Sequence, residues 1–397
     1  MALLAHPMGR LPQRGQVNAR NEEPANHRHR FHRTGMVIVW LLLGAACNAP
    51  GLIGGPPSGL DRPTPAEPVN NPTAPSSPSE RPAASPTPQP TPLPDELVWF
   101  APNMGSTDYA ALFSDPDAWA AARSQVDVFK FYAQNVMQQP CDICGDNALG
   151  AFAAVNAFES LQGWAIATAV EVPAVKEWGC HGEEGFQAAS TVIQNVQANG
   201  GRVTLLAMDE PMLYGQEPFG DLNCGLSLEE TAQRTARYIQ RIQSIFPGVL
   251  VGDIEPYPHY SVSQLKTWIE TLESFDGELA FFHLDVDIER VRVEGQAVRS
   301  DLQALEVFCQ EHEIGFGVII TSNWTAAGAN RSYVQSALGW AETVADAIGR
   351  PDHLIFQSWQ GPAPSGRHEI PVNLTPNAAD GYSHTQLILD GLALFDQ

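Results

Sequence analysis

Basic residues are scarce in this chain of 397 residues, and so are charged residues of any kind. Lysine and arginine together number 22 against 45 aspartates and glutamates, which gives a net charge of −23. Such a chain repels a phosphate backbone, so we do not expect a nucleic acid as its partner. Only 17% of the residues are charged while 44% are hydrophobic, a composition that excludes a mostly disordered protein.

The apolar run near the N-terminus is too short to span a bilayer, which takes about 20 residues. It covers residues 36–43, follows three arginines within residues 28–33, and leads through small residues to Cys47. A basic segment, a short apolar segment and small residues predict a secretory signal. The ending on cysteine resembles the lipobox of bacterial lipoproteins, in which that cysteine is lipidated, although Gly44 stands where leucine is usual. We therefore expect export, with Cys47 lipidated and the lipid as the only membrane contact. The alternative is an ordinary signal peptide and a secreted protein.

Charge and proline divide the chain into three parts. Residues 1–47 carry six arginines against two glutamates, whereas residues 96–397 carry 14 basic and 39 acidic side chains, a net charge of −25. Residues 48–94 hold 15 of the 32 prolines, a composition that cannot bury a core and is typical of an extended spacer. The expected organisation is a signal or lipobox segment over 1–47, a Pro-rich disordered tether over 48–95, and one folded domain over 96–397.

The folded part repeats one pattern eight times: an apolar run ending in polar residues, a loop, and an amphipathic helical stretch. The expected strands are 97–103, 126–135, 164–172, 203–210, 249–257, 279–287, 315–324 and 354–360. Alternating strands and helices imply parallel strands, and eight units in about 300 residues fit a (β/α)8 TIM barrel of the α/β class. A doubly wound open sheet is the alternative, but residues 103–106 are not the glycine-rich phosphate loop typical of it.

Acidic side chains gather where the fourth, fifth and sixth expected strands end. In a parallel barrel these ends share one rim, which is where such barrels carry out catalysis. Polar residues at strand ends can simply meet solvent, but acids on three consecutive strands would repel one another without a function. The candidate catalytic carboxylates are Asp209, Glu210, Glu255, Asp285 and Asp287.

Strand alternation selects the side chains that point into the barrel mouth. His283, Asp285 and Asp287 share one face of the sixth strand, and we expect this face to line the mouth. Asp209 and Glu210 are adjacent at the end of the fourth strand, so alternation does not choose between them.

Two carboxylates across a cleft with aromatic walls suit the cleavage of a glycosidic bond. One acid protonates the leaving oxygen, while the other attacks the anomeric carbon or activates water. Aromatic rings stack on the C–H faces of sugars, and polar side chains bond the hydroxyls. The candidates for substrate binding are Asn103, Lys130, Tyr132, Glu171, Tyr257, His283, Asn323, Trp324, Gln357 and Trp359.

The order of the eight units and residues 208–211 (Met-Asp-Glu-Pro) resemble the TIM-barrel glycoside hydrolases. The resemblance covers residues 97–397, and many families of that superfamily place a catalytic acid at the end of strand four. It implies that Glu210 is the general acid/base of an enzyme acting on an oligo- or polysaccharide.

The partner of Glu210 departs from the large retaining clan of that superfamily. That clan has Asn-Glu on strand four and a nucleophilic glutamate on strand seven, whereas residues 321–324 contain no carboxylate. The partner must then be Glu255, Asp285 or Asp287. A pair from strands four and six resembles the alpha-galactosidase-like clan, which favours one of the two aspartates.

Two other functions use the same rim. Asp209, Glu255, His283 and Asp285 could bind a divalent ion for hydrolysis or sugar isomerisation, although no tight ligand spacing supports a metal site. A barrel that binds carbohydrate without catalysis is the other alternative. The leading expectation is a glycosidase without metal or cofactor that acts as a monomer.

Four cysteines follow neighbouring strands: Cys141, Cys144, Cys180 and Cys224. In an exported protein such a set predicts two disulfides, for which three pairings are open. A four-cysteine zinc site is the alternative, prompted by the spacing of Cys141 and Cys144. Cys309 is expected to be a buried core residue.

Overall fold

The computed structural model describes residues 96–138, 141, 144–176, 179–216, 218–219, 222–322, 330–358 and 382–396. Cys47 and the segments expected as signal and tether lie outside these residues. Three residues of the expected rim, Asn323, Trp324 and Trp359, lie outside them too. Within the described ranges, no helix combines the length and apolar character needed to cross a membrane.

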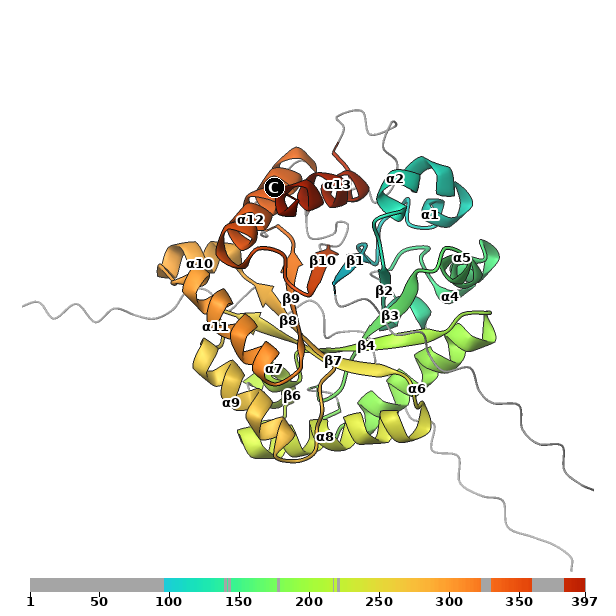
Figure 1. Cartoon of the computed structure of the whole chain (residues 1–397). Coiled ribbons are helices and arrows are strands. Elements are labelled where there is room, and N and C mark those ends of the chain that lie inside the picture. The colour runs from blue at the N-terminus through green and yellow to red at the C-terminus, as the bar shows by residue number, and fades with distance from the viewer. Residues whose placement is uncertain are drawn as a thin grey trace, which may run out of the picture. The chain divides into compact units, whose positions relative to one another are not determined.

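Eight parallel strands close into a barrel, in the order β1-β10-β9-β8-β7-β4-β3-β2 (Figure 1). The ring closes where β1 pairs with both β10 and β2. The strands are β1 (Leu97–Ala101), β2 (Val128–Tyr132), β3 (Ala167–Val172), β4 (Val203–Asp209), β7 (Leu250–Tyr257), β8 (Phe281–Val286), β9 (Gly315–Ile320) and β10 (His353–Gln357). The prediction of a single (β/α)8 barrel is confirmed.

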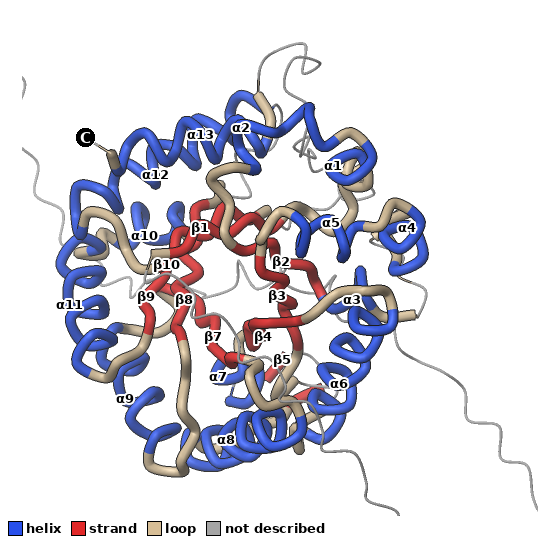
Figure 2. Tube along the Cα trace, turned by 45° about the vertical axis from the view of Figure 1, so that its right-hand side comes forward, coloured by secondary structure: helices blue, strands red, loops and turns tan. Residues whose placement is uncertain are grey.

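Helices surround the ring of strands on its outside (Figure 2). They are α1 (Ala111–Ser114), α2 (Ala120–Arg123), α3 (Ala133–Val136), α4 (Leu149–Ala154), α5 (Ala157–Gly163), α6 (Glu183–Ala198), α7 (Pro211–Gln216), α8 (Leu228–Ile245), α9 (Val262–Glu273), α10 (Ile288–Glu294), α11 (Val298–Glu311), α12 (Asn330–Ile348) and α13 (His384–Phe395). A 3-10 turn (Pro116–Trp119) and a small hairpin of β5 (Pro218–Phe219) and β6 (Leu222–Asn223) complete the fold. Ser227 and Ser261 begin α8 and α9 with capping boxes, which satisfy amide groups at the helix start.

Side chains of the strands alternate between two hydrophobic cores. Those that point outward pack against the helices. Those that point inward fill the barrel: Leu97, Trp99, Val128, Ala169, Leu205, Ala207, Ile254, Phe281, Ile319 and Ile355. Because faces alternate along a strand, this division also fixes which polar side chains at the strand ends face the mouth.

Two inward glycines make room for large side chains in the barrel interior. A Cβ at Gly252 would lie 2.2 Å from Cδ2 of Phe281, and one at Gly317 would lie 2.5 Å from Cδ2 of His283. Any other residue at either position would collide with its neighbour. These glycines let Phe281 and His283 occupy the barrel centre.

A layer of rings closes the barrel interior. His283 Nε2 lies 2.8 Å from His353 Nδ1, and the Trp99 ring packs edge-on against His283 with centroids 4.8 Å apart. Burial lowers the pKa of His283 well below its usual value and the pKa of His353 to about 3. Both imidazoles are therefore neutral at neutral pH, and the layer carries no charge.

Candidate active site

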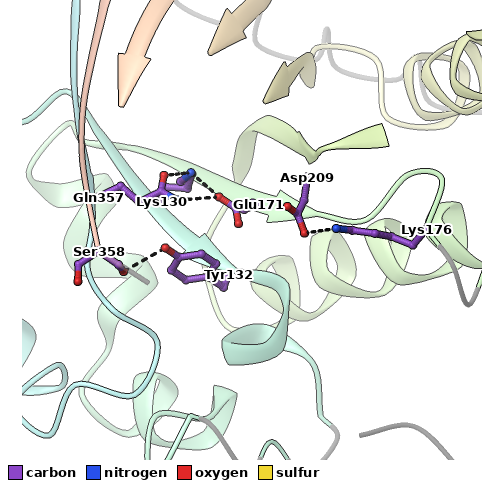
Figure 3. A network of polar contacts seen from close by, with 7 residues as sticks. All are labelled: Lys130, Tyr132, Glu171, Lys176, Asp209, Gln357 and Ser358. Carbon is purple, nitrogen blue, oxygen red and sulfur yellow. Dashed lines mark hydrogen bonds and ion pairs between the residues drawn. The ribbon is translucent and has the colours of Figure 1, made fainter. Parts of the chain in front are cut away.

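A buried lysine joins three strands at the mouth of the barrel (Figure 3). Lys130 Nζ on β2 lies 2.6 Å from Glu171 Oε2 on β3 and donates to Gln357 Oε1 on β10 at 2.5 Å. Gln357 Nε2 donates to the same oxygen of Glu171 at 3.3 Å. Burial raises the pKa of Glu171, an effect that the neighbouring Lys130 opposes. The structure thus brings together three residues that the sequence placed at the rim.

Tyr132 and Asn103 shape the loops beside this cluster. The Tyr132 hydroxyl donates to the backbone oxygen of Ser358 at 3.1 Å (Figure 3), and its ring belongs to a small cluster with Met104 and Cys144. Asn103 is buried, and its Oδ1 accepts a hydrogen bond from Gly105 N at 2.8 Å. The contacts of Tyr132 join the loop after β1 to the end of β10.

A second lysine pairs with the inward carboxylate of β4. Lys176, in the loop after β3, places its Nζ 2.6 Å from Asp209 Oδ2 (Figure 3). The same Nζ lies 3.2 Å from the centroid of the Tyr214 ring. Sequence reasoning missed this residue. The available signal was composition, because the chain has three lysines, of which Lys130 lies on β2 and Lys176 follows the neighbouring strand β3.

Glu210 directly follows β4 and is 4% exposed. Its φ of 53° is left-handed, a conformation that side chains other than glycine rarely adopt. Burial raises the pKa of Glu210 well above its usual value, and the Asp209 and Asp285 carboxylates raise it further against the opposing Lys176. Burial and the neighbouring carboxylates therefore both favour the protonated form of the Glu210 carboxyl.

Asp285 points inward from β8 and is half-buried. Burial and, to a lesser extent, the Glu171 carboxylate raise the pKa of Asp285 to about 7, while Lys130 opposes the rise. Asp287, the other candidate on this strand, is exposed and begins α10, where its Oδ1 accepts a hydrogen bond from Arg290 N at 3.0 Å. The inward carboxylate of β8 is thus Asp285.

Three of the expected rim residues lie elsewhere. Glu255 faces the helices from the outer side of β7, and its Oε1 accepts a hydrogen bond from Met212 N at 2.6 Å. Tyr257 is also on the outer side, with its hydroxyl 2.5 Å from Asp301 Oδ2. His283 is fully buried in the ring layer.

The metal-ligand set of the alternative function, Asp209, Glu255, His283 and Asp285, is therefore not assembled. Among the residues that the structure describes, no group of three or more histidine, cysteine or acidic side chains is arranged to hold a metal ion.

Two disulfides form in the loops, Cys141–Cys144 and Cys180–Cys224. The prediction of two disulfides is confirmed, and the four-cysteine zinc site is wrong because these sulfurs are bonded in pairs. Cys180–Cys224 links the loop after β3 to the segment before α8, and Cys224 Sγ lies 3.3 Å from the backbone oxygen of Lys176. It therefore restrains the loop that carries Lys176. Cys309 is free and buried, as expected.

No protein-family model matches the sequence, and no curated protein matches it. Among solved structures, the chain is similar to a modular endo-β-1,4-mannanase of glycoside hydrolase family 26 from Cellulomonas fimi, at 13% identity and a TM-score of 0.46, over 75% of this chain and 70% of that one. A GH5_18 protein from Streptomyces cattleya gives 10% identity and a TM-score of 0.45, over 76% and 81%. An endo-β-1,6-glucanase gives 11% and 0.45, over 77% and 78%.

The chain is a (β/α)8-barrel protein with a carboxylate-rich mouth.

Proposed function

We propose that this protein is a glycoside hydrolase in which Glu210 is the general acid/base and Asp285 is its partner. One observation carries the proposal. Of the four carboxylates at the mouth, Glu171 and Asp209 are each paired with a lysine. Within the described ranges, Glu210 and Asp285 form no ion pair, and each is flanked by other carboxylates. A structural role would favour neutralising all four, whereas cleavage of a glycosidic bond needs one carboxyl group that donates a proton and one carboxylate that is free to attack or to activate water.

The environments of the two carboxyl groups support different roles. Burial raises the pKa of Glu210 well above its usual value, which favours its protonated form and supports the role of proton donor to the leaving oxygen. The pKa of Asp285 is about 7, so its carboxylate is available above that pH to attack the anomeric carbon or to activate water.

The mouth supports a neutral glycan as the substrate. Lys130 is fully buried and already bonded to Glu171 and Gln357, so it is not available to neutralise an anionic sugar. The folded domain carries a net charge of −25, which repels anionic polysaccharides. Glu171 and Gln357 remain predicted contacts with sugar hydroxyls. Trp324, Trp359 and Asn323 remain predicted contacts with the substrate.

We expect the activity to rise with pH around pH 7. Asp285 must be ionised to act as nucleophile or base, and its pKa of about 7 means that protonation removes activity below that value. The measurement is kcat/KM from pH 5 to 9. Asp285→Asn and Asp287→Asn identify the partner. The variant that lacks the true partner should lose turnover, whereas the other variant should keep both turnover and the acidic limb near pH 7. An acidic limb near pH 4 would contradict the proposed pair.

The reaction class itself is tested with 4-nitrophenyl glycosides and neutral polysaccharides, by release of nitrophenol and of new reducing ends. Binding of a glycan without cleavage would replace the proposal by the carbohydrate-binding alternative. Turnover that is lost in EDTA and restored by a divalent ion would replace it by the metal-dependent alternative.

The protein is further proposed to act outside the cytoplasm. Two disulfides support an oxidising compartment. The basic and apolar N-terminal residues support export, and residues 48–95 support a tether between Cys47 and the barrel. We expect Cys47→Ala to move the protein from the membrane fraction to the soluble fraction. An unchanged membrane fraction would contradict lipidation at this cysteine.

A further inference from the structure

The turn that carries Glu210 has a backbone conformation that must be held in place. Its φ of 53° brings Cβ close to the following carbonyl oxygen, so this conformation is disfavoured for any residue but glycine. A residue stays in such a conformation only where its surroundings hold it there, and strained residues of this kind cluster at functional sites.

Two consecutive residues of β7 hold this turn from both sides. Glu210 N donates to the backbone oxygen of Ile254 at 3.0 Å, and Met212 N donates to Glu255 Oε1 at 2.6 Å. Pro211 lies between these two bonds and has its own φ fixed by its ring. The backbone on each side of the Glu210 side chain is therefore anchored to the same strand.

We propose that Glu255 is a positioning residue that fixes the direction of the Glu210 side chain by bonding the first turn of α7. This inference rests on the proposed function of Glu210. Glu255 itself is fully buried on the outer side of β7, so it does not touch a substrate in the mouth.

Glu255 acts as a hydrogen-bond acceptor rather than as a charge. Burial, and then the nearby Asp253 and Glu210 carboxyls, raise the pKa of Glu255 well above its usual value, which favours the uncharged form of its side chain. Its second oxygen, Oε2, is buried without a hydrogen-bond partner among the described residues. Glutamine has the same shape and keeps the accepting oxygen, so Glu255→Gln should preserve the role.

Two substitutions remove the bond, and one substitution serves as a matched control. Glu255→Leu removes the acceptor, and Glu255→Asp keeps a carboxyl group that is one methylene too short to reach Met212 N. The control is Asp253→Leu, because Asp253 is buried on the same outer face of β7 but bonds Trp268 Nε1 of α9 at 2.7 Å. It removes a buried acceptor without touching the Glu210 turn.

The first measurement is kcat and KM on the 4-nitrophenyl glycoside that the unmodified protein cleaves, with folding checked by circular dichroism. Glu255→Leu and Glu255→Asp should lower kcat by roughly 10- to 100-fold with KM nearly unchanged. A misplaced Glu210 carboxyl is no longer aligned with the leaving oxygen, whereas the contacts that bind the substrate remain. Glu255→Gln and Asp253→Leu should keep the kcat of the unmodified protein. A folded Glu255→Asp protein with normal kcat overturns the proposal, even if Glu255→Leu fails to fold.

The second measurement needs no substrate. The Glu210 carboxyl is titrated by ¹³C NMR in glutamate-labelled protein, with its signal assigned by its loss in Glu210→Gln. Its midpoint should fall by about one pH unit in Glu255→Asp, as the freed side chain moves toward water, and stay in place in Glu255→Gln and Asp253→Leu. A midpoint shift together with full hydrolysis by Glu210→Gln would refute the proposed function but keep the positioning role. An unchanged midpoint would refute the positioning role alone.

Discussion

Glu210→Gln should lower kcat by roughly 10²- to 10⁴-fold on a natural glycan while leaving glycan binding intact. Glutamine has the shape of the protonated glutamic acid but cannot give up a proton to the leaving oxygen. The loss should be smaller on 4-nitrophenyl glycosides, because nitrophenolate leaves without much help from an acid. Comparing kcat for the two leaving groups therefore tests whether Glu210 donates a proton to the leaving oxygen, and not only whether the residue is needed for activity.

The control for this substitution is Glu270→Gln, which changes an exposed glutamate of α9 far from the mouth in the fold. It should keep the kcat of the unmodified protein on both leaving groups. Equal losses for Glu210→Gln on both leaving groups would argue against proton donation. Full activity of Glu210→Gln on a cleaved glycan would contradict the central assignment.

Lys130→Met should lower the free energy of unfolding by about 3–5 kcal/mol, because it leaves the buried Glu171 carboxylate without its cation. Lys130 also lowers the pKa of Asp285, so its removal should raise that pKa above 7. The activity that depends on ionised Asp285 should then begin at a higher pH. Urea unfolding and the pH dependence of kcat/KM measure the two effects separately.

The third lysine of the chain supplies the control. Lys266 is half-buried, with its Nζ 5.1 Å from the centroid of the Phe308 ring, and it has no part in the mouth. Lys266→Met should cost far less stability and leave the pH profile unchanged. The double variant Lys130→Met/Glu171→Gln should recover part of the lost stability, since it removes both members of the buried pair. Similar losses for the two lysines would show that the ion pair contributes little.

The barrel was predictable because hydrophobic runs and amphipathic stretches alternate with little interruption. Residues 126–135 show the limit of that pattern, since the strand β2 (Val128–Tyr132) ends earlier and α3 (Ala133–Val136) begins at once. The hairpin of β5 and β6 was not predicted, because its strands have two residues each and leave no periodic signal.

The site was predictable where one face of a strand was apolar. In β8, Phe282 and Leu284 mark the outer face, so Asp285 was correctly expected to point inward. In β7 the inner face includes Gly252 and the outer face includes Glu255, so hydrophobicity did not distinguish the two faces. Alternation also fails at Glu210, whose left-handed backbone breaks the regular strand.

The pairs Gly252–Phe281 and Gly317–His283 couple neighbouring strands in the barrel interior. A larger residue at either glycine becomes tolerable only when its partner becomes smaller, so each pair shares one fixed volume across two strands. Substitutions in the barrel interior below the mouth must therefore change both residues of a pair at once. Libraries that vary a single position would reject many interiors that a paired substitution allows.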